Sequence, residues 1–185
     1  MVITKTSIYC DKDFYLNPCE SPFPRQAPPV IGCLISDKDG KSIVSFEVFK
    51  GAIKFFMNIN DEFSQNQGEF QIDLIPMYVS AIELLSRELK IQGLPGIEIN
   101  GTNIKLKILF KFEDFTITLF VNPNIDFTVI EDLVNAYLTN LIEEFNDEFN
   151  DMKCKSSNDF INFLERIGLC WLIDLNNDYI QLIKK

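Results

Sequence analysis

The sequence predicts an α+β fold in which helices pack on an antiparallel sheet of about five strands. A wholly apolar run at Val30–Ser36 is followed by alternating residues at Lys41–Phe49, and residues 96–124 are also rich in alternating apolar residues. Both are strand patterns. Residues 73–90 and 126–152 instead carry apolar residues at helical spacing. The expected order from residue 30 is β-β-α-β-β-β-α-α, and a sheet covered by helices is the simplest arrangement for it.

The first two strands are expected to form a β-hairpin across Asp39-Gly40, because glycine tolerates the positive φ of a tight turn. The apolar run of the first strand is typical of a central strand that is buried on both faces. Asp37, Asp39 and Glu47 also raise the question of a calcium loop. Lys41 would then occupy the third ligand position, and Gly40 comes two residues early. The turn of a hairpin therefore explains these residues better.

Residues 51–70 are ambiguous, and we expect them to continue the second strand and then form a loop. The helix at 73–90 is expected to begin at Asp73 as N-cap, with Pro76 in its first turn. Gly93 and Pro95 should end it. We expect its apolar stripe to face the core. That stripe consists of Leu74, Met77, Tyr78, Ala81, Leu84, Leu85 and Leu89.

Residues 96–124 are expected to form three strands, at Ile97–Asn100, Asn103–Phe112 and Phe115–Asn122, with turns at 100–101 and 113–114. The middle strand has one apolar face and one face that is rich in lysine, so one side should be buried and the other partly wet. The two sets are Ile104, Leu106, Ile108 and Phe110 against Lys105, Lys107, Leu109 and Lys111.

The longest helix is expected at residues 126–152, where Thr128 and Glu131 have the spacing of a capping box. Its apolar stripe is formed by Ile130, Leu133, Val134, Tyr137, Leu138, Leu141, Ile142, Phe145 and Phe149. A short helix at Asn158–Ile167 should follow, with Ser157 as N-cap and Gly168 as C-cap. The end of the chain is expected to form a hairpin of two short strands around residues 176–177.

Three parts of the chain follow from these patterns. Residues 1–29 form a proline-rich extension, expected to be either an ordered arm that wraps the domain or a flexible tail. Its part at 17–29 can be neither a helix nor a central strand, whereas Thr4–Tyr9 could form a short strand. Residues 30–168 form the domain. Residues 169–185 form an extension that should pack on it, because the apolar side chains there, Trp171 among them, are too numerous to leave in water.

The composition narrows the functional classes. The formal charge of -10 and a pI of about 4.5 make nucleic-acid binding unfavourable and favour a partner with a basic patch. The acidic run at residues 143–151 is either a docking patch for such a partner or a solvated helix face.

No apolar run is long enough to span a membrane. The N-terminus lacks a signal-peptide core and five cysteines are irregularly spaced, so we expect reduced thiols in the cytoplasm.

The residues do not predict an enzyme. The chain has no histidine, which removes Ser-His and Cys-His nucleophile pairs and histidine metal sites. Gly96 and Gly101 have the separation of a phosphate loop, but Thr102 and Asn103 follow where Lys and Ser or Thr belong. We expect no catalytic residues, no cofactor and no metal.

The order and proportions of these elements resemble the longin domain and its roadblock relatives, in particular archaeal longin-like proteins. The resemblance covers about 30–168. It is carried by "ISDKDGKSIVSFEVF", "YVSAIELLSREL", "IKLKILFKFEDFTITLFVN" and the closing helices "VIEDLVNAYLTNLIEEFNDEF" and "SSNDFINFLERI". The proline-rich start and the residues after 169 depart from that family's pattern. The resemblance implies a non-catalytic scaffold or adaptor for small GTPases, their regulators or complexes of the vesicle-trafficking type.

Two functional classes remain open. The first is a protein-interaction module that binds a small GTPase or another longin or roadblock protein, as a homodimer or heterodimer. In such proteins the second strand and the following helix commonly build the binding surfaces, which points here to Ile43, Ser45, Glu47, Phe49, Met77, Tyr78 and Ile82. The second is a small-molecule sensor with a PAS-like or profilin-like sheet. A closed apolar cavity would favour the sensor, and an exposed edge strand or apolar helix face would favour the adaptor.

Overall fold

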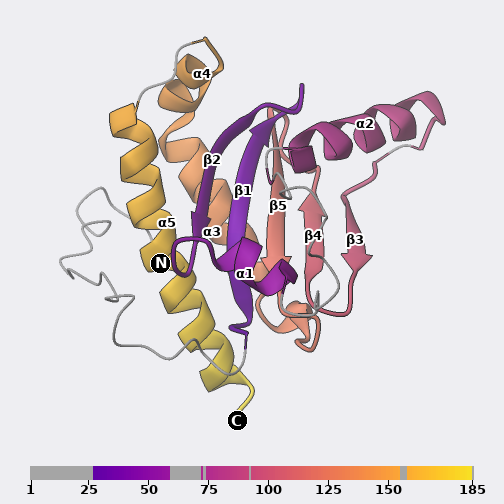
Figure 1. Cartoon of the computed structure of the whole chain (residues 1–185). Helices are drawn as coiled ribbons and strands as arrows, with labels where there is room; N and C mark the ends of the chain where they lie inside the picture. Colours follow the sequence, from indigo (N-terminus) through magenta and orange to yellow (C-terminus); the bar gives the residue numbers. More distant parts are fainter. Residues whose placement is uncertain (1–26, 59–71, 73, 92, 155–157, 185) are drawn as a thin grey trace.

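A computed structural model describes residues 27–58, 72, 74–91, 93–154 and 158–184. Its centre is a five-stranded antiparallel sheet in the order β2-β1-β5-β4-β3 (Figure 1). The predicted α+β class with about five strands is therefore confirmed. The strands are β1 (Val30–Asp37), β2 (Ser42–Glu47), β3 (Gly96–Asn100), β4 (Lys105–Leu109) and β5 (Phe115–Val121).

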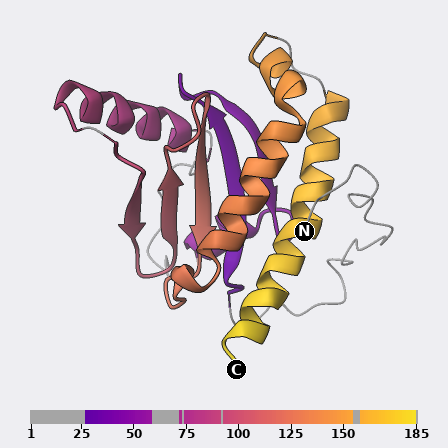
Figure 2. The same cartoon turned by 180° about the vertical axis from the view of Figure 1, so that it is seen from behind.

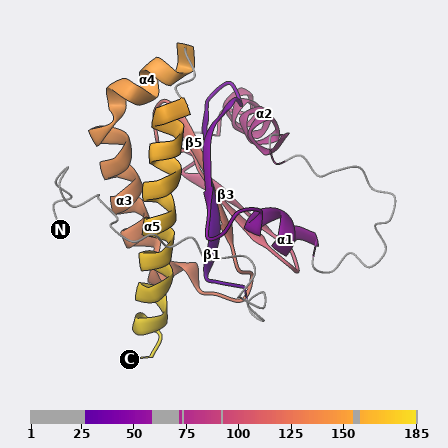
Figure 3. The same ribbon diagram turned by 60° about the vertical axis from the view of Figure 1, so that its left-hand side comes forward.

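Helices cover both faces of the sheet (Figure 3). One face carries α1 (Ala52–Asn58) and α2 (Leu74–Glu88). The opposite face carries α3, α4 and α5, of which α3 and α5 run beside each other when the molecule is seen from behind (Figure 2). These helices are α3 (Glu131–Glu144), α4 (Asn146–Cys154) and α5 (Asn158–Leu182), and a short 3-10 turn, η1 (Phe127–Val129), precedes α3.

β1 is buried on both sides, as the apolar run at 30–36 predicted, and β5 beside it is buried in the same way. All residues of β5 are buried, and β1 is buried up to Ser36. Alternate residues of β5 contribute to different cores. Ile117 and Leu119 pack with α3–α5, whereas Phe120 packs with α1 and α2. Because β1 and β5 lie between β2 and β4, both outer helix layers rest on them.

The predicted hairpin is confirmed, with its turn at Asp37–Lys41. Gly40 has a φ of 86°, a conformation that other L residues rarely adopt. One carboxylate oxygen of Asp37 accepts hydrogen bonds from the backbone N–H groups of Asp39 and Lys41, at 3.1 and 2.8 Å. The Asp37 carboxylate thus closes the turn. The register between β1 and β2 shifts near Ile35, so Ile43 lies at a β-bulge of the edge strand.

The two faces of β4 are also as predicted. Ile104, Ile108 and Phe110 are buried in the core below α1 and α2. On the other face, Lys105 and Lys107 lie near Glu98, with nitrogen–oxygen distances of 3.7 and 3.6 Å. This face is therefore partly wet, while the other is apolar.

Two predictions for the middle of the chain are wrong. The chain after β2 does not continue as a strand but forms α1. The predicted helix at 126–152 is interrupted at Phe145, so that α3 and α4 are separate. Its start also differs, because the side chain of Asp126 caps η1 by accepting from the N–H of Thr128, and Ile130 precedes α3 without a side-chain cap. The predicted capping box is therefore not formed.

The largest difference lies at the end of the chain, where α5 replaces a short helix and the predicted hairpin. Gly168 is not a C-cap but lies inside α5, where an added Cβ would overlap the ring of Phe46. Asn176 lies in the same helix, and its side-chain amide bonds with both backbone groups of Val30, at 2.7 and 2.9 Å. The sequence predicts a helix end at Gly168 and a turn at Asn176, yet each residue is a point of close contact with the sheet.

The remaining expectations concern helix caps, the N-terminal extension, the cysteines and membrane spans. The predicted N-caps Asp73 and Ser157, and most of the extension at 1–29, lie outside the described residues. Cys33 is free and buried, whereas Cys170 is disulfide-bonded, so the expectation of reduced thiols is wrong at Cys170. Among the helices of the described residues, none combines the length and apolar character needed to cross a bilayer.

Candidate interaction surface

The outward side of α2 is apolar. Met77 and Tyr78 are 59% and 68% exposed, and Leu85 and Leu89 are 57% and 64% exposed. With Leu74 and Leu84 they form one stripe, because residues spaced by three and four positions share a helix face. The sequence predicted that this stripe would face the core, and that prediction is wrong.

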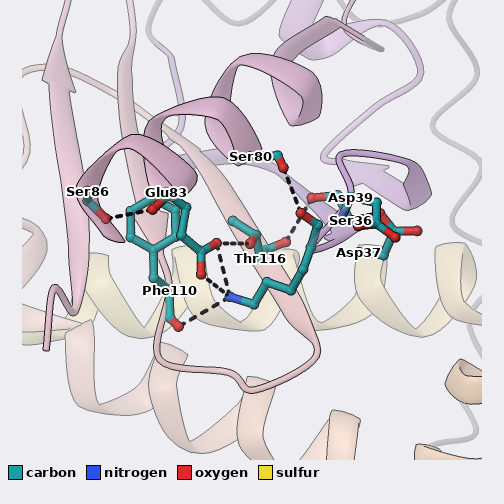
Figure 4. Close-up of polar contacts among 9 residues, drawn as sticks. Ser36, Asp37, Asp39, Ser80, Glu83, Ser86, Phe110 and Thr116 are labelled. Atoms are coloured by element: carbon teal, nitrogen blue, oxygen red, sulfur yellow. Dashed lines mark hydrogen bonds and ion pairs between the residues drawn. The ribbon is translucent and has the colours of Figure 1, made fainter. Parts of the chain in front are cut away.

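The side of α2 that faces the sheet is of mixed character. Ile75 and Val79 are buried in the core with residues of β1, β4 and β5. Beside them lie Ser80, Glu83 and Ser86, which all make hydrogen bonds (Figure 4). The helix therefore turns these three polar positions partly inward, opposite to the usual arrangement of an amphipathic surface helix, while Arg87 and Glu88 remain exposed.

Glu83 is the centre of this polar cluster. Its carboxylate accepts hydrogen bonds from the Nζ of Lys38 at 3.1 and 3.2 Å and from the hydroxyl of Thr116 at 3.3 Å. The Nζ of Lys38 also donates to the carbonyl of Phe110 at 3.4 Å. The two charged side chains are only 21% and 15% exposed. An ion pair so far out of water is tolerated only when hydrogen bonds satisfy its remaining atoms, and here they do.

The turn of the hairpin completes the contact with α2. The hydroxyl of Ser80 donates to the carbonyl of Lys38 at 2.6 Å. At Gly40 an added Cβ would lie 3.0 Å from the Cα of Met77 and 3.1 Å from the carbonyl of Pro76. The first turn of α2 therefore lies directly against the hairpin turn, which holds the helix in place at two successive turns.

A further exposed apolar side chain lies at one edge of the sheet. β3 is an edge strand, and its residue Ile99 is 45% exposed. Ile99 pairs with Leu106 and so lies on the sheet face that carries α1 and α2. The turn after β3 contacts the end of α1 through Asn103, so Ile99 lies toward α1 and apart from the α2 stripe. Exposed apolar helix faces and edge strands are each common at surfaces that bind another protein.

The other edge of the sheet is less accessible. α5 packs against β2, and Ile43 is 8% exposed. Glu47 directs its carboxylate at the start of α1 and accepts a hydrogen bond from the N–H of Ile53 at 3.0 Å. Phe49 packs with the rings of Phe55 and Phe56.

The seven residues predicted for binding are thus divided. Met77 and Tyr78 lie together on the exposed side of α2, and Ile82 is half-buried at its flank. The four residues from Ile43 to Phe49 lie at the opposite edge of the sheet. Three of them, Ile43, Glu47 and Phe49, are buried or make contacts that stabilise the fold. The placement favours the helix over the second strand.

Sequence reasoning did not identify Lys38, Glu83, Ser80 and Thr116. A signal was present, because Ser80, Glu83 and Ser86 recur at helical spacing opposite the apolar stripe. Thr116 and Thr118 alternate in the same way along β5. A polar helix face is normally expected to face solvent. Only the polar residues that alternate along the strand below it, Thr116 and Thr118, indicate that this face is turned toward the sheet.

Burial weakens the acidity of two reactive side chains, Cys33 and Tyr137. Burial raises the pKa of the Cys33 thiol far above its ordinary value, which makes it a poor nucleophile. Burial likewise raises the pKa of the Tyr137 hydroxyl. Within the described part of the chain, no group of three or more acidic or cysteine side chains could hold a metal ion.

Compared with protein-family models and with curated protein sequences, the chain matches none.

Proposed function

We propose that the protein is a non-catalytic interaction module that binds a protein partner on the apolar side of α2. One observation carries the proposal, the exposed stripe formed by Leu74, Met77, Tyr78, Leu84, Leu85 and Leu89. Burying one such side chain stabilises a complex by about 1.5–3 kcal/mol relative to full exposure. A stripe of this size is costly to leave in water and is typical of a binding site.

The area supports a specific interface and not a chance contact. Standard interfaces bury about 800 Å² on each partner. The stripe with Ile91, two residues after Leu89, offers seven large apolar side chains, each between 40% and 68% exposed. Several hundred Å² of apolar surface is thus available, on the order of the apolar centre of such an interface.

The resemblance to longin domains indicates the kind of partner. The element order supports a scaffold or adaptor of that kind, for a small GTPase, a trafficking-type complex, or another longin or roadblock protein. The formal charge of -10 favours a partner that is basic around its apolar contact. We place this function in the cytoplasm. Disulfide bonds such as that at Cys170 are uncommon in this compartment, where thiols are normally kept reduced.

Sedimentation at several concentrations tests the proposal, with the protein alone and with small GTPases loaded with GDP or a GTP analogue. We expect one partner, or a second copy, to bind. Leu85→Asp should abolish that complex. Leu133→Asp is the matched control, because Leu133 is a leucine of 44% exposure on α3, on the opposite face of the sheet. A protein that stays monomeric and binds no GTPase, but co-purifies with a small molecule, would replace the adaptor with the sensor.

A further inference from the structure

We infer that the polar network of Lys38, Glu83, Thr116 and Ser80 determines which side of α2 faces solvent, and so keeps the apolar stripe exposed. The network controls the exposure of the surface that the proposed function uses, and in this sense the inference rests on the proposed function. The test of the network needs no partner, because the orientation of α2 is a property of the isolated protein.

The helix has two sides that could face the sheet. At 100° per residue, the exposed stripe and the buried side around Val79 are centred roughly 140° apart. Burial of apolar area alone would select the stripe, since it carries more large apolar side chains than the side that holds Ile75 and Val79. Another interaction must therefore select the observed orientation.

The sheet below α2 supplies that interaction. Ser36, Thr116 and Thr118 are buried polar residues at the paired ends of β1 and β5. The neighbouring residues Ile35 and Ile117 pack with the helices of the opposite face, so these three polar side chains point to the face that carries α2. A polar surface of this kind fits the Ser80 and Glu83 side of the helix better than a row of leucines.

Rotation of the helix would carry Glu83 and Ser80 into solvent and remove them from the groups on the sheet side. The ammonium of Lys38 and the buried hydroxyl of Thr116 would lose Glu83, and the carbonyl of Lys38 would lose Ser80. Removing one partner of a largely buried polar pair costs more than the pair itself contributes. The network joins the hairpin turn, β5 and α2 (Figure 4) and so favours the observed orientation.

Charge reversal tests the inference, with Lys38→Glu, Glu83→Lys and the double variant. The readout is nitration of Tyr78 in the isolated protein, followed by mass spectrometry of the peptide that contains it. We expect each single reversal to reduce Tyr78 nitration several-fold, because the stripe turns inward. The double variant should restore it, because the ion pair is re-formed with opposite polarity.

Lys107→Glu is the matched control, since Lys107 lies 3.6 Å from Glu131 in an ion pair away from α2 and should leave Tyr78 nitration unchanged. If a single reversal does not fold, the milder Glu83→Gln supplies the same comparison with a smaller effect. Folded variants in which Tyr78 reacts as in the wild type would overturn the inference, as would a double variant without recovery. Neither result would bear on whether a partner binds.

Discussion

Glu47 shows how a single carboxyl group responds to its place in the fold. Its side chain lies between the start of α1 and α5, where burial raises its pKa above the ordinary value of 4.5. Hydrogen bonds from the N–H groups of Ile53, Ala52 and Gly51 partly lower the pKa again, while the charge of Glu165 raises it. The ionised form is therefore less favourable in the folded protein than in the unfolded chain.

The sign of the pH dependence follows from this shift. A raised folded-state pKa contributes stability that is complete below pH 4.5 and is lost as the pH rises through that folded-state pKa. Gln at this position stays neutral and can still accept from Ile53. We expect the stability of Glu47→Gln relative to the wild type to increase with pH above 4.5, measured by urea unfolding at several pH values. Glu88→Gln, an exposed position on α2, is the control, and a pH-independent difference would contradict the prediction.

Gly168 is a second residue whose role depends on a contact. In the interior of a helix, Gly→Ala normally stabilises by about 1 kcal/mol. Here the new methyl group would overlap the Phe46 ring, and overpacking of this kind costs about 1–3 kcal/mol. We expect Gly168→Ala to lower the free energy of unfolding, and Phe46→Leu in the same chain to recover part of the loss. Asn177→Ala, at an exposed position of α5, should not be destabilising.

At the scale of elements, α5 is attached to the sheet by Asn176. Its amide pairs with the N–H and the carbonyl of Val30, as a neighbouring strand would. Asn176→Leu would leave both backbone groups without these partners in a buried place, and each loss costs about 1–3 kcal/mol. We expect a loss of roughly 2–6 kcal/mol in chemical denaturation, from the sum of the two.

The control for this variant is Asn177→Leu, an adjacent exposed position on the same helix. It should change the free energy of unfolding by no more than about 0.5 kcal/mol, which is usual for surface substitutions. Equal effects at the two positions would show that the bonds to Val30 do not contribute.

The whole molecule has three layers, and its stability depends on all of them. The segment after Leu169 places Trp171, Leu172, Leu175 and Tyr179 in the core, with Trp171 stacked on Tyr137 at 4.2 Å. Four such side chains contribute about 6–12 kcal/mol when each contributes 1.5–3. That sum is comparable with the whole stability of a domain, about 5–15 kcal/mol.

Deletion of residues 170–185 should therefore unfold the domain, not trim a tail. Near-ultraviolet circular dichroism and size-exclusion chromatography would report loss of fixed packing and aggregation. Deletion of residues 183–185 alone removes the exposed Ile183 and Lys184 and should leave the melting curve unchanged. A monodisperse 1–169 protein with the wild-type melt would refute the prediction.

The sequence by itself determined the five strands of the sheet and the faces of β1 and β4, although it also predicted strands where α1 and α5 lie. The apolar run of β1, the alternation of β4 and the glycine of the first turn each report a local property, either the period of two or a required φ. Such properties need no knowledge of distant residues. The five-stranded antiparallel sheet covered by helices followed from them.

The tertiary structure alone decided which way the helices face and where they end. Gly168 and Asn176 resemble helix breakers until Phe46 and Val30, more than 100 residues earlier in the chain, are placed beside them. The stripe of α2 has the pattern of a core face, and only the hydroxyl of Thr116 and the ammonium of Lys38 beside Glu83 show that the other side is buried. Periodicity shows that a helix has two unlike sides. Only the surface below the helix determines which of them is buried, because burial free energy depends on the partner as well as on the side chain.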